Sequence, residues 1–411
     1  MKIIFCILIL LLNSPIVFGK VILVGKSQAT LSLKAGVAKA EPGDTILLHA
    51  GVYKEGNIII SKSISLIGVD FPIIDGENKF EILTISGKNI LIRGIHFRNS
   101  GSSSMNDYAS INIIDAGNVT VRDNRIENAH FAVHVGNSKN CRIYSNVIYG
   151  KAVSEQTSGN GIHLWKCDSM YVDKNTITGH RDGIYFEFVT NSIISNNYSH
   201  DNIRYGLHFM FSNHDSYVNN IFKDNGAGVA VMFSHHVLMM DNIFQHNWGT
   251  NAYGLLLKEI SDATIARNTF VENTVGILME GTNRIDAMMN NFTSNGWAMR
   301  IQASCEATKV ELNNFQGNTF DVATNGTRLT KMFAFNYWDK YEGYDMNKDK
   351  IGDIPFHPVS MYSMVIEQNP HSLILLRSFM VSLLDKAEKA IPSLTPEFLM
   401  DDTPSMKVLI I

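Results

Sequence analysis

Asparagine recurs through the middle of this chain at a nearly constant spacing. Consecutive members of the series lie 22 or 23 residues apart, with two longer intervals of 26 and 29 residues. Two positions after each asparagine stands a large apolar residue, except at Ser199. A repeat of this length indicates a solenoid, in which each repeat forms one turn and contacts only its neighbours. The series comprises Asn124, Asn146, Asn175, Asn197, Asn220, Asn242, Asn268, Asn290 and Asn313.

A second repeat runs in phase with the first and consists of a small residue followed by an alternating apolar pattern, as in GIHL and GLHF. Short alternating segments between Asn, Asp, Gly and Ser turns predict β-strands without intervening helices. Strands that recur at this period must stack turn on turn, about 4.8 Å apart. We therefore predict an all-β solenoid, a right-handed parallel β-helix with about 22–23 residues per turn. The second repeat begins at Ala132, Gly161, Gly183, Gly206, Gly228, Gly254 and Gly276.

In such a coil each asparagine lies directly above its counterpart in the preceding turn. A buried amide can then donate to the side-chain oxygen of the next one, which avoids a cost of about 1–3 kcal/mol for an unsatisfied buried polar group. We interpret the asparagines as a structural ladder and assign them no catalytic role.

Composition narrows the function classes. The 411 residues would suit two or three globular domains, but the unbroken repeat predicts one elongated unit. Lys and Arg total 35 against 39 Asp and Glu, and no basic segment with interleaved aromatic residues is present, so we expect no nucleic acid partner. Beyond Cys6 in the N-terminal apolar segment, the cysteines are too few and odd in number for a disulfide framework, namely Cys141, Cys167 and Cys305. Of these, Cys167 lies near a predicted turn and is the candidate for a reactive or metal-ligating thiol.

The first nineteen residues have the pattern of a secretory signal peptide. Lys2 precedes a ten-residue apolar segment, and small residues occupy the expected cleavage positions up to Gly19. The apolar segment is too short to span a bilayer. We expect an exported protein, most simply a periplasmic one.

Four segments are predicted along the chain. Residues 1–19 form the signal peptide, and residues 20–335 form the β-helix, with a short helix at about residues 29–40 that caps its first turn. Residues 336–358 form a cap segment, and residues 359–411 form an amphipathic tail.

The tail is a candidate for partner binding, because residues 371–391 have the periodicity of a helix with one apolar face, ended by Pro392. Insertions at residues 151–160 and 248–251 explain the two long intervals in the asparagine series, and inserted loops of solenoids often build binding sites. The apolar face of the predicted helix contains Leu373, Leu376, Met380, Leu383 and Leu384.

Histidine and methionine gather on the outward face of the glycine-led strands. Stacking places imidazole and thioether groups on adjacent turns, and these are ligands for Cu(I). The same stripe, with Trp165 and Tyr185, would equally form an apolar docking patch for another protein. Phe188, Phe211 and Phe233 are expected to stack toward the interior. The candidate copper stripe comprises His163, Glu187, His208, Met210 and Met232.

Two further groups are candidate metal ligands. His235 and His236 lie close to Met239 and Met240, although Met239 falls on an inward column. The segment DMNKDKIGD resembles the start of a calcium-binding loop, with Lys350 and Phe356 at positions where the full pattern has Gly and Glu. An acidic turn without calcium explains this segment equally well. Its candidate ligands are Asp345, Asn347, Asp349 and Asp353.

A polysaccharide-cleaving β-helix would need clustered carboxylates on one face to act as acid and base. The outward columns contain no adjacent pair of carboxylates. Asp182, Asp201, Asp241 and Asp262 are predicted to lie in turns. A secreted polysaccharide-binding or polysaccharide-cleaving protein is the alternative function, supported by the aromatic residues Trp165 and Tyr185.

Several segments together resemble the NosD family. They are the secretory signal, the strands GIHLW, RDGIYFEF and RYGLHFMFS, the segment NYWD with DMNKDKIGDIPF, and the tail LLDKAEKAIPSLTPEFLMDD. The resemblance covers nearly the whole mature chain. The coil repeats occur in many β-helix proteins, so the cap segment and the tail carry most of the specificity.

The resemblance implies a periplasmic accessory protein, not an enzyme, in denitrification. Such a protein assists assembly of the copper–sulfur site of nitrous oxide reductase. Its implied partners are a membrane ABC transporter (NosF/NosY-type), a copper chaperone lipoprotein (NosL-type) and the reductase (NosZ-type). The helical tail would engage the transporter and hold the protein at the inner membrane. Copper is the implied ligand, whereas calcium is suggested only by the acidic segment.

Overall fold

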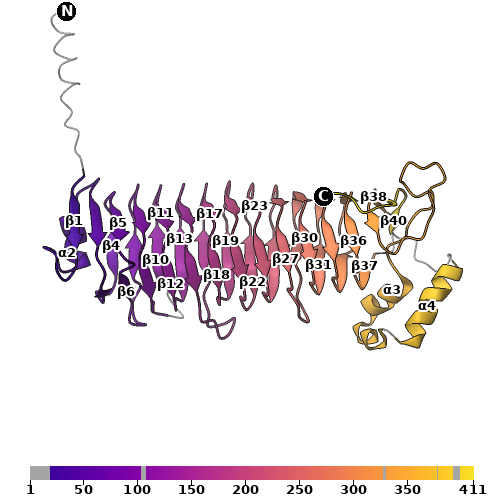
Figure 1. Cartoon of the computed structure of the whole chain (residues 1–411), viewed down its shortest axis with the longest axis horizontal. Coiled ribbons are helices and arrows are strands. Elements are labelled where there is room, and N and C mark those ends of the chain that lie inside the picture. Colours follow the sequence, from indigo (N-terminus) through magenta and orange to yellow (C-terminus); the bar gives the residue numbers. More distant parts are fainter. Residues whose placement is uncertain (1–18, 103–107, 327–329, 377, 392–398) are drawn as a thin grey trace, which may run out of the picture.

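The computed structural model describes residues 19–102, 108–326, 330–376, 378–391 and 399–411. Within them the chain forms about 13 turns of a parallel β-helix, which confirms the predicted solenoid. Figure 1 shows the turns stacked along one long axis, with short helices at both ends. The predicted signal peptide lies outside the described residues, apart from its last residue.

From β2 onward, each turn contributes one short strand to each of three parallel sheets, named A, B and C in the order in which the chain visits them. Sheet A contains β1 (Val21–Val24), β2 (Thr45–Leu48), β5 (Ser65–Gly68), β8 (Leu91–Arg93), β11 (Thr120–Arg122), β14 (Arg142–Tyr144), β17 (Tyr171–Asp173), β20 (Ile193–Ser195), β23 (Ser216–Val218), β26 (Leu238–Met240), β29 (Ser261–Ala266), β32 (Asn283–Met288), β35 (Lys309–Glu311), β38 (Thr330–Ala334) and β40 (Leu399–Asp401). Sheet B contains β3 (Val52–Tyr53), β6 (Ile73–Asp75), β9 (His96–Arg98), β12 (Arg125–Glu127), β15 (Val147–Tyr149), β18 (Thr176–Thr178), β21 (Tyr198–His200), β24 (Ile221–Lys223), β27 (Ile243–Gln245), β30 (Thr269–Val271), β33 (Asn291–Thr293), β36 (Asn314–Gln316) and β39 (Tyr337–Trp338). Sheet C contains β4 (Ile58–Ile60), β7 (Leu83–Ile85), β10 (Ala109–Ile114), β13 (Phe131–Gly136), β16 (Ile162–Trp165), β19 (Asp182–Glu187), β22 (Tyr205–Met210), β25 (Ala227–Met232), β28 (Leu255–Lys258), β31 (Val275–Glu280), β34 (Trp297–Ile301) and β37 (Phe320–Thr324).

The asparagine series lies buried at the corner between sheets A and B and forms the predicted ladder. The backbone N–H and Nδ2 of Asn220 both donate to Oδ1 of Asn242, at 2.9 and 3.0 Å. Asn220 Nδ2 also donates to the carbonyl of Ile194 in the preceding turn, at 3.0 Å. The same pairwise donation links every member from Asn124 onward and continues to Asn336, one member beyond the predicted series.

A second buried ladder at the corner between sheets B and C was not predicted. It starts at Asn202, whose backbone N–H and Nδ2 both donate to Oδ1 of Asn225, at 3.1 and 2.9 Å. Between the two ladders, phenylalanine rings stack in the core, with Phe244, Phe270 and Phe292 at centroid distances of 4.6 and 4.9 Å. Two amide ladders and one ring stack therefore fix the register of the turns. The later members of the second ladder are Asn247, Asn273, Asn295 and Asn318.

The C-terminal segment returns to the coil and ends the first ladder. Strand β40 pairs with β38 in sheet A, so residues from the predicted tail complete the last turn. Oδ2 of the buried Asp401 accepts hydrogen bonds from the backbone N–H and Nδ2 of Asn336, at 3.2 and 3.0 Å, and from Nε1 of Trp338, at 3.0 Å. The coil thus extends past the boundary predicted at residue 335, through β39 and β40.

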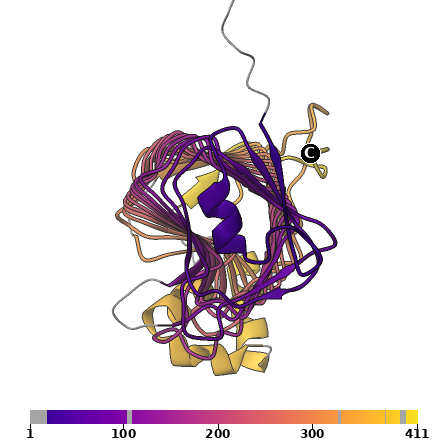
Figure 2. The same cartoon turned by 90° about the vertical axis from the view of Figure 1, so that its left-hand side faces the viewer.

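Helices close or flank the two ends of the coil. Helix α2 (Leu33–Lys39), N-capped by Ser32, lies across the N-terminal opening, as Figure 2 shows, and fits the predicted cap. At the other end, α3 (Met361–Gln368) packs against β37 and against α4 (Phe379–Ala390).

The predicted single helix over residues 371–391 is wrong. A 3₁₀ helix, η1 (Pro370–Leu375), is followed by a new start at Ser378, whose hydroxyl accepts from the Val381 N–H and caps α4. Serine favours such a cap over a helix interior. The longest described helix, α4, has twelve residues, and none of the described helices is long and apolar enough to cross a membrane.

Asp321 is buried in β37, the last strand of sheet C, next to Lys340, whose Nζ lies 3.2 Å from Oδ2 of the carboxylate. Burial raises the pKa of Asp321 to about 6, although Lys340 opposes the shift. Lys340 Nζ also donates to the carbonyls of Asn318 and Thr319. The Asp321 carboxyl group is therefore easier to bury in its protonated form than in its ionised form.

Replacing Asp401 tests the importance of the last acceptor. Asp401→Leu would leave three buried donors unsatisfied, at about 1–3 kcal/mol each, so we expect the unfolding free energy to fall by at least about 3 kcal/mol. Asp401→Asn keeps a side-chain oxygen in place and should lose less. Urea denaturation followed by circular dichroism measures both variants. Equal losses would contradict the acceptor role.

Asp321→Asn tests the buried carboxyl group. A carboxyl whose folded pKa is raised stabilises the protein below its unfolded pKa of about 4, and this contribution is lost as the pH rises through about 6. The amide does not titrate. Between pH 4 and pH 7, the difference in unfolding free energy between the variant and the parent should therefore shift in favour of the variant, by up to about 2–3 kcal/mol. Melting temperatures at both pH values provide the comparison, and parallel pH profiles for the two proteins would refute it.

Candidate functional site

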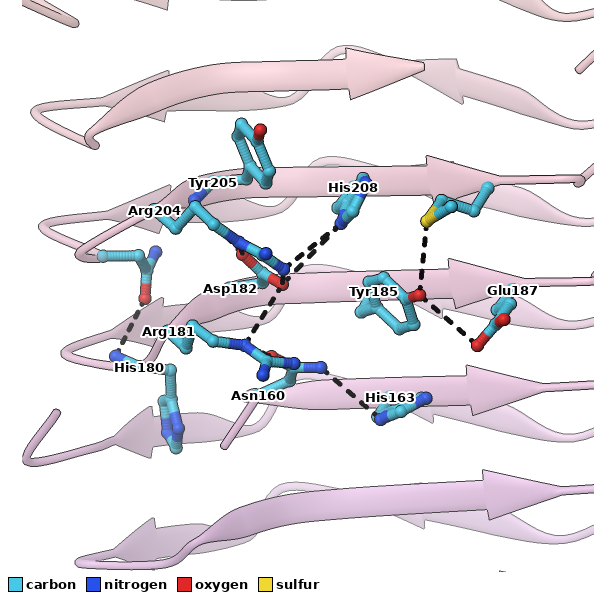
Figure 3. A network of polar contacts seen from close by, with 12 residues as sticks. Asn160, His163, His180, Arg181, Asp182, Tyr185, Glu187, Arg204, Tyr205 and His208 are labelled. Atoms are coloured by element: carbon cyan, nitrogen blue, oxygen red, sulfur yellow. Dashed lines mark hydrogen bonds and ion pairs between the residues drawn. The ribbon is translucent and has the colours of Figure 1, made fainter. Parts of the chain in front are cut away.

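The outward face of sheet C carries the predicted stripe, and the strand register confirms which residues are neighbours. Tyr185 pairs with His163 on one side and with His208 on the other. Met210 pairs with Glu187 and with Met232. Figure 3 shows this face from outside, with the side chains of successive turns one above another.

Tyr185 separates the two histidines of the stripe. Its ring centroid lies 4.7 Å from that of His163 and 4.9 Å from that of His208. Its hydroxyl donates to Oε2 of Glu187 at 3.3 Å and contacts Sδ of Met210 at 3.5 Å. Burial, followed by the charge of Glu187, raises the pKa of Tyr185 to about 12, so the phenol stays protonated. Tyr185 is therefore buried and contacts the neighbouring residues of the stripe. It does not present the exposed ring that we predicted for docking.

The buried Asp182 forms an ion pair with the half-buried Arg204 beside His208 (Figure 3). Arg204 Nε donates to Oδ1 of Asp182 at 2.8 Å, and the carboxylate lies 3.8 Å from Nδ1 of His208. Burial alone would raise the pKa of Asp182, but the hydrogen bond and charge of Arg204, together with the contact to His208, outweigh burial and lower the pKa. Asp182 begins β19, so its predicted place in a turn is wrong. Because Arg204 holds it as a carboxylate, it is poorly suited to act as a general acid.

The insertion at residues 151–160 ends beside His163, the first residue of the stripe. Its last residue, Asn160, is buried, and its Nδ2 lies 3.4 Å from Nδ1 of His163. Oδ1 of Asn160 accepts from Nε of Arg181 at 3.2 Å, as seen in Figure 3. Burial lowers the pKa of His163 to about 3, so the imidazole is neutral, which is the form that binds metals.

The stripe separates into two groups of donors. His163 lies beneath the inserted loop, whereas Met210 lies beside Glu187 and Met232, with the buried phenol of Tyr185 between the two groups. Nδ1 of His208 faces the Asp182 carboxylate, and its Nε2 is buried without a hydrogen-bond partner. Soft thioether donors suit Cu(I), but the two imidazoles do not meet at one point.

Two expectations about this region are wrong. Phe188, Phe211 and Phe233 do not point inward: they stack at centroid distances of 5.1 Å on the surface, in the left-handed backbone conformation with φ of 51° to 54°. Cys167 is buried, and its Sγ donates to main-chain carbonyls, including that of Trp165 at 3.3 Å. Burial raises the pKa of Cys167 to about 11, so it is not a reactive thiolate.

Histidines also gather at the corner between sheets C and A. His214, His235 and His236 each offer a ring nitrogen, and these nitrogens lie within 4.8 Å of one another. His235 and His236 were noted from the sequence, but His214 was missed. The signal was present, because His214 and His236 are 22 residues apart and hence stack in successive turns.

The acidic segment forms a compact turn whose carboxylates bond to the main chain. Asp345 Oδ1 accepts from the Lys348 N–H at 2.6 Å, and its Oδ2 accepts from the Lys350 N–H at 2.8 Å. Asp353 Oδ2 accepts from the Met346 N–H at 2.6 Å. The carboxylates thus have main-chain partners, and this geometry fits the acidic turn that was the alternative to a calcium loop. Asn347 and Asp349 bond to each other within the same turn.

The predicted docking residues differ in exposure. Trp165 is exposed, with Lys166 Nζ 4.3 Å from the centre of its ring. On the C-terminal helices, Leu373, Met380 and Leu383 are exposed. Leu376 packs instead against a small core of Phe320, Tyr362, Ile366 and Val381, and Leu384 is half-buried.

Comparison with known structures shows the fold alone. The pneumococcal adhesin PfbA matches with a TM-score of 0.55 and 12% identity, over 71% of this chain and 94% of PfbA. The alginate lyase AlyF-OU02 matches with a TM-score of 0.51 and 11% identity, over 75% of this chain and 86% of the lyase. An adhesin and a lyase on the same coil illustrate that the fold does not determine the activity.

Comparison with known sequences is more specific. Residues 145–350 match the family described as "Periplasmic copper-binding protein (NosD)". A "Probable ABC transporter binding protein NosD" from Pseudomonas aeruginosa is 27% identical, over 93% of this chain and 95% of the relative. A protein of the same name from Stutzerimonas stutzeri is 26% identical, over 88% of this chain and 86% of the relative. The family match spans half of the chain, and this chain belongs to the NosD family of periplasmic copper-binding proteins.

Proposed function

We propose that this protein is a periplasmic accessory protein that binds a membrane ABC transporter through its C-terminal helices and assists maturation of the copper–sulfur site of nitrous oxide reductase. The main support is the surface of η1 and α4 in a chain whose relatives are named ABC transporter binding proteins. The other partners are a copper chaperone lipoprotein and the reductase itself. The protein acts as a scaffold and performs no catalysis.

The C-terminal helices have the architecture of a docking unit. Val381 is buried on the inner face of α4, whereas Phe379 is 82% exposed and Met380 56% exposed on the other side. Ile374 on η1 is 88% exposed. Exposed large apolar side chains on adjacent short helices are typical of a surface that another protein covers.

The coil also offers a second binding surface, along the edge from which the C-terminal helices project. Figure 1 shows the inserted loops and the C-terminal helices on the same lower edge of the coil. A partner that contacts α4 can therefore extend toward the stripe that begins at His163. We propose that copper or a copper-bearing partner contacts this stripe, through Met210, Met232 and Glu187, with His163 and His208 as neighbouring donors.

The polysaccharide alternative has weaker support. The enclosed carboxylate of this face, Asp182, is already paired with Arg204, and the buried Tyr185 does not offer a sugar-stacking surface. Trp165 remains as an exposed ring. Depolymerisation of alginate or pectin by the purified protein, without binding to the reductase, would favour the alternative.

Substitutions on α4 test the docking role. Removing the whole tail would also remove Asp401 and open the coil, so point changes are preferable. Phe379→Glu combined with Leu383→Glu places charges on the exposed face and should reduce co-purification with the NosF/NosY-type transporter at least tenfold, about 1.4 kcal/mol or more. The parent melting temperature should be kept, because both side chains face solvent.

A matched control places charge on exposed apolar residues at the far end of the coil. Val52→Glu with Ile59→Glu makes the same chemical change near α2 and should leave transporter binding intact. Undiminished binding by the α4 variant would refute the docking role, and an equal loss in both variants would assign the effect to charge alone.

A further inference from the structure

The histidine corner, defined as His214, His235 and His236, lies apart from the sheet C stripe. His214 follows β22, and the other two follow β25 in the next turn. Within the described residues, they are the one group of three or more His, Cys, Asp or Glu side chains that brings a ligand atom from each within 4.8 Å of the others.

The backbone of the histidine corner is held from both neighbouring turns. The His214 N–H donates to the His235 carbonyl at 3.2 Å, and the His236 N–H donates to the Ser261 carbonyl at 3.2 Å. The His235 N–H donates to Oδ1 of Asn213 at 2.8 Å. The three Cα positions are therefore fixed by the coil, and a ligand would only need to reorient side chains.

The rings are close enough to converge after small rotations. His214 and His236 stack at 4.8 Å with an interplanar angle of 23°, and His235 stands nearly perpendicular to both, at 5.4 and 5.1 Å. His214 and His236 are exposed. Nitrogens bound to one metal ion at about 2.0–2.1 Å are at most about 4 Å apart. Side-chain rotations that move the ring nitrogens by about an ångström would therefore bring them within binding distance of one ion.

The coil itself does not require histidine at these positions. His214 and His236 have φ of 59° and 54°, in the left-handed region. Asparagine meets the same requirement in this column at Asn118, Asn140 and Asn191. Backbone geometry therefore explains why a polar residue stands here but not why imidazoles occupy two successive turns with a third beside them.

Above the histidine corner stands a carboxylate that is paired with an arginine. Asp262 stacks over His236, and Arg284 Nη2 donates to its Oδ2 at 2.7 Å. The charge of the arginine is thus directed to the carboxylate. Phe188, Phe211 and Phe233 run along the same corner and give the histidines an exposed apolar border.

We propose that the histidine corner binds one divalent first-row transition metal ion, with Cu(II) held more tightly than Zn(II). Imidazole nitrogen suits both ions, and the general affinity order favours Cu(II). Three protein ligands leave a coordination position toward solvent, which a donor from another protein can fill during exchange. The histidine corner would be a metal-binding surface separate from the stripe, and metal binding there does not depend on docking by α4.

Titration of the full-length mature protein, purified without a polyhistidine tag, tests the histidine corner. Cu(II) and Zn(II) are added separately, and binding is followed by calorimetry and, for Cu(II), by the nitrogen superhyperfine pattern in the electron paramagnetic resonance spectrum. We expect one site, with affinity reduced at least about tenfold by His214→Ala or His236→Ala. The double variant should lose the nitrogen pattern while keeping the parent circular dichroism spectrum.

Two control variants make the result specific. His246→Ala removes an exposed histidine on another turn, which pairs with Asp224, and should leave the affinity unchanged. The triple variant His208→Ala, Met210→Ala, Met232→Ala removes donors from the stripe and should also retain Cu(II) binding at the corner. Unchanged affinity in the His214 and His236 variants would overturn the proposal, as would an equal loss in the His246 control. Either outcome leaves the transporter experiment to be judged separately.

Discussion

The fold depends on one repeated interaction, the donation of two N–H groups from each ladder asparagine to the side-chain oxygen of the next. A primary amide can accept and donate at the same time, so the pattern extends from turn to turn without leaving a buried polar atom unsatisfied. The ladder at the corner between sheets A and B tolerates changes elsewhere. The insertion at residues 151–160 lengthens the loop at the corner between sheets B and C, while Asn146 still donates to Asn175 at 3.0 Å.

This regularity explains which features were predictable. The asparagine spacing set the register, and the register correctly placed Tyr185 between His163 and His208. It also contained two pairs that were not recognised, His214 with His236 and Asp182 with Arg204, each separated by 22 residues. Both pairs lie close in space because residues one period apart stack.

The errors occurred where the period-two alternation of a strand stops. At the corner after β19, Phe188 adopts a left-handed conformation, so counting inward and outward positions along the strand misplaced its ring. Residues outside the repeat were equally hard to predict. Nothing in the local pattern of Leu399–Asp401 shows that it pairs with β38, because Asp401 contacts Asn336 across 65 residues of sequence. The break between η1 and α4 had a local signal that was missed, namely Ser378 as an N-cap.

The carboxylate at the end of the ladder also bears on how long such a coil can grow. An asparagine passes the pattern on, since it offers donors to the next turn, but the side chain of Asp401 only accepts from Asn336 and Trp338 and so ends the series. Until Asp401 arrives, the last turn presents unsatisfied donors and an open strand edge, a surface on which a second copy could add. Asp401 follows Asn336 only after 65 further residues, so the polarity of one side chain both sets the number of turns and protects the end of the completed coil against end-to-end association.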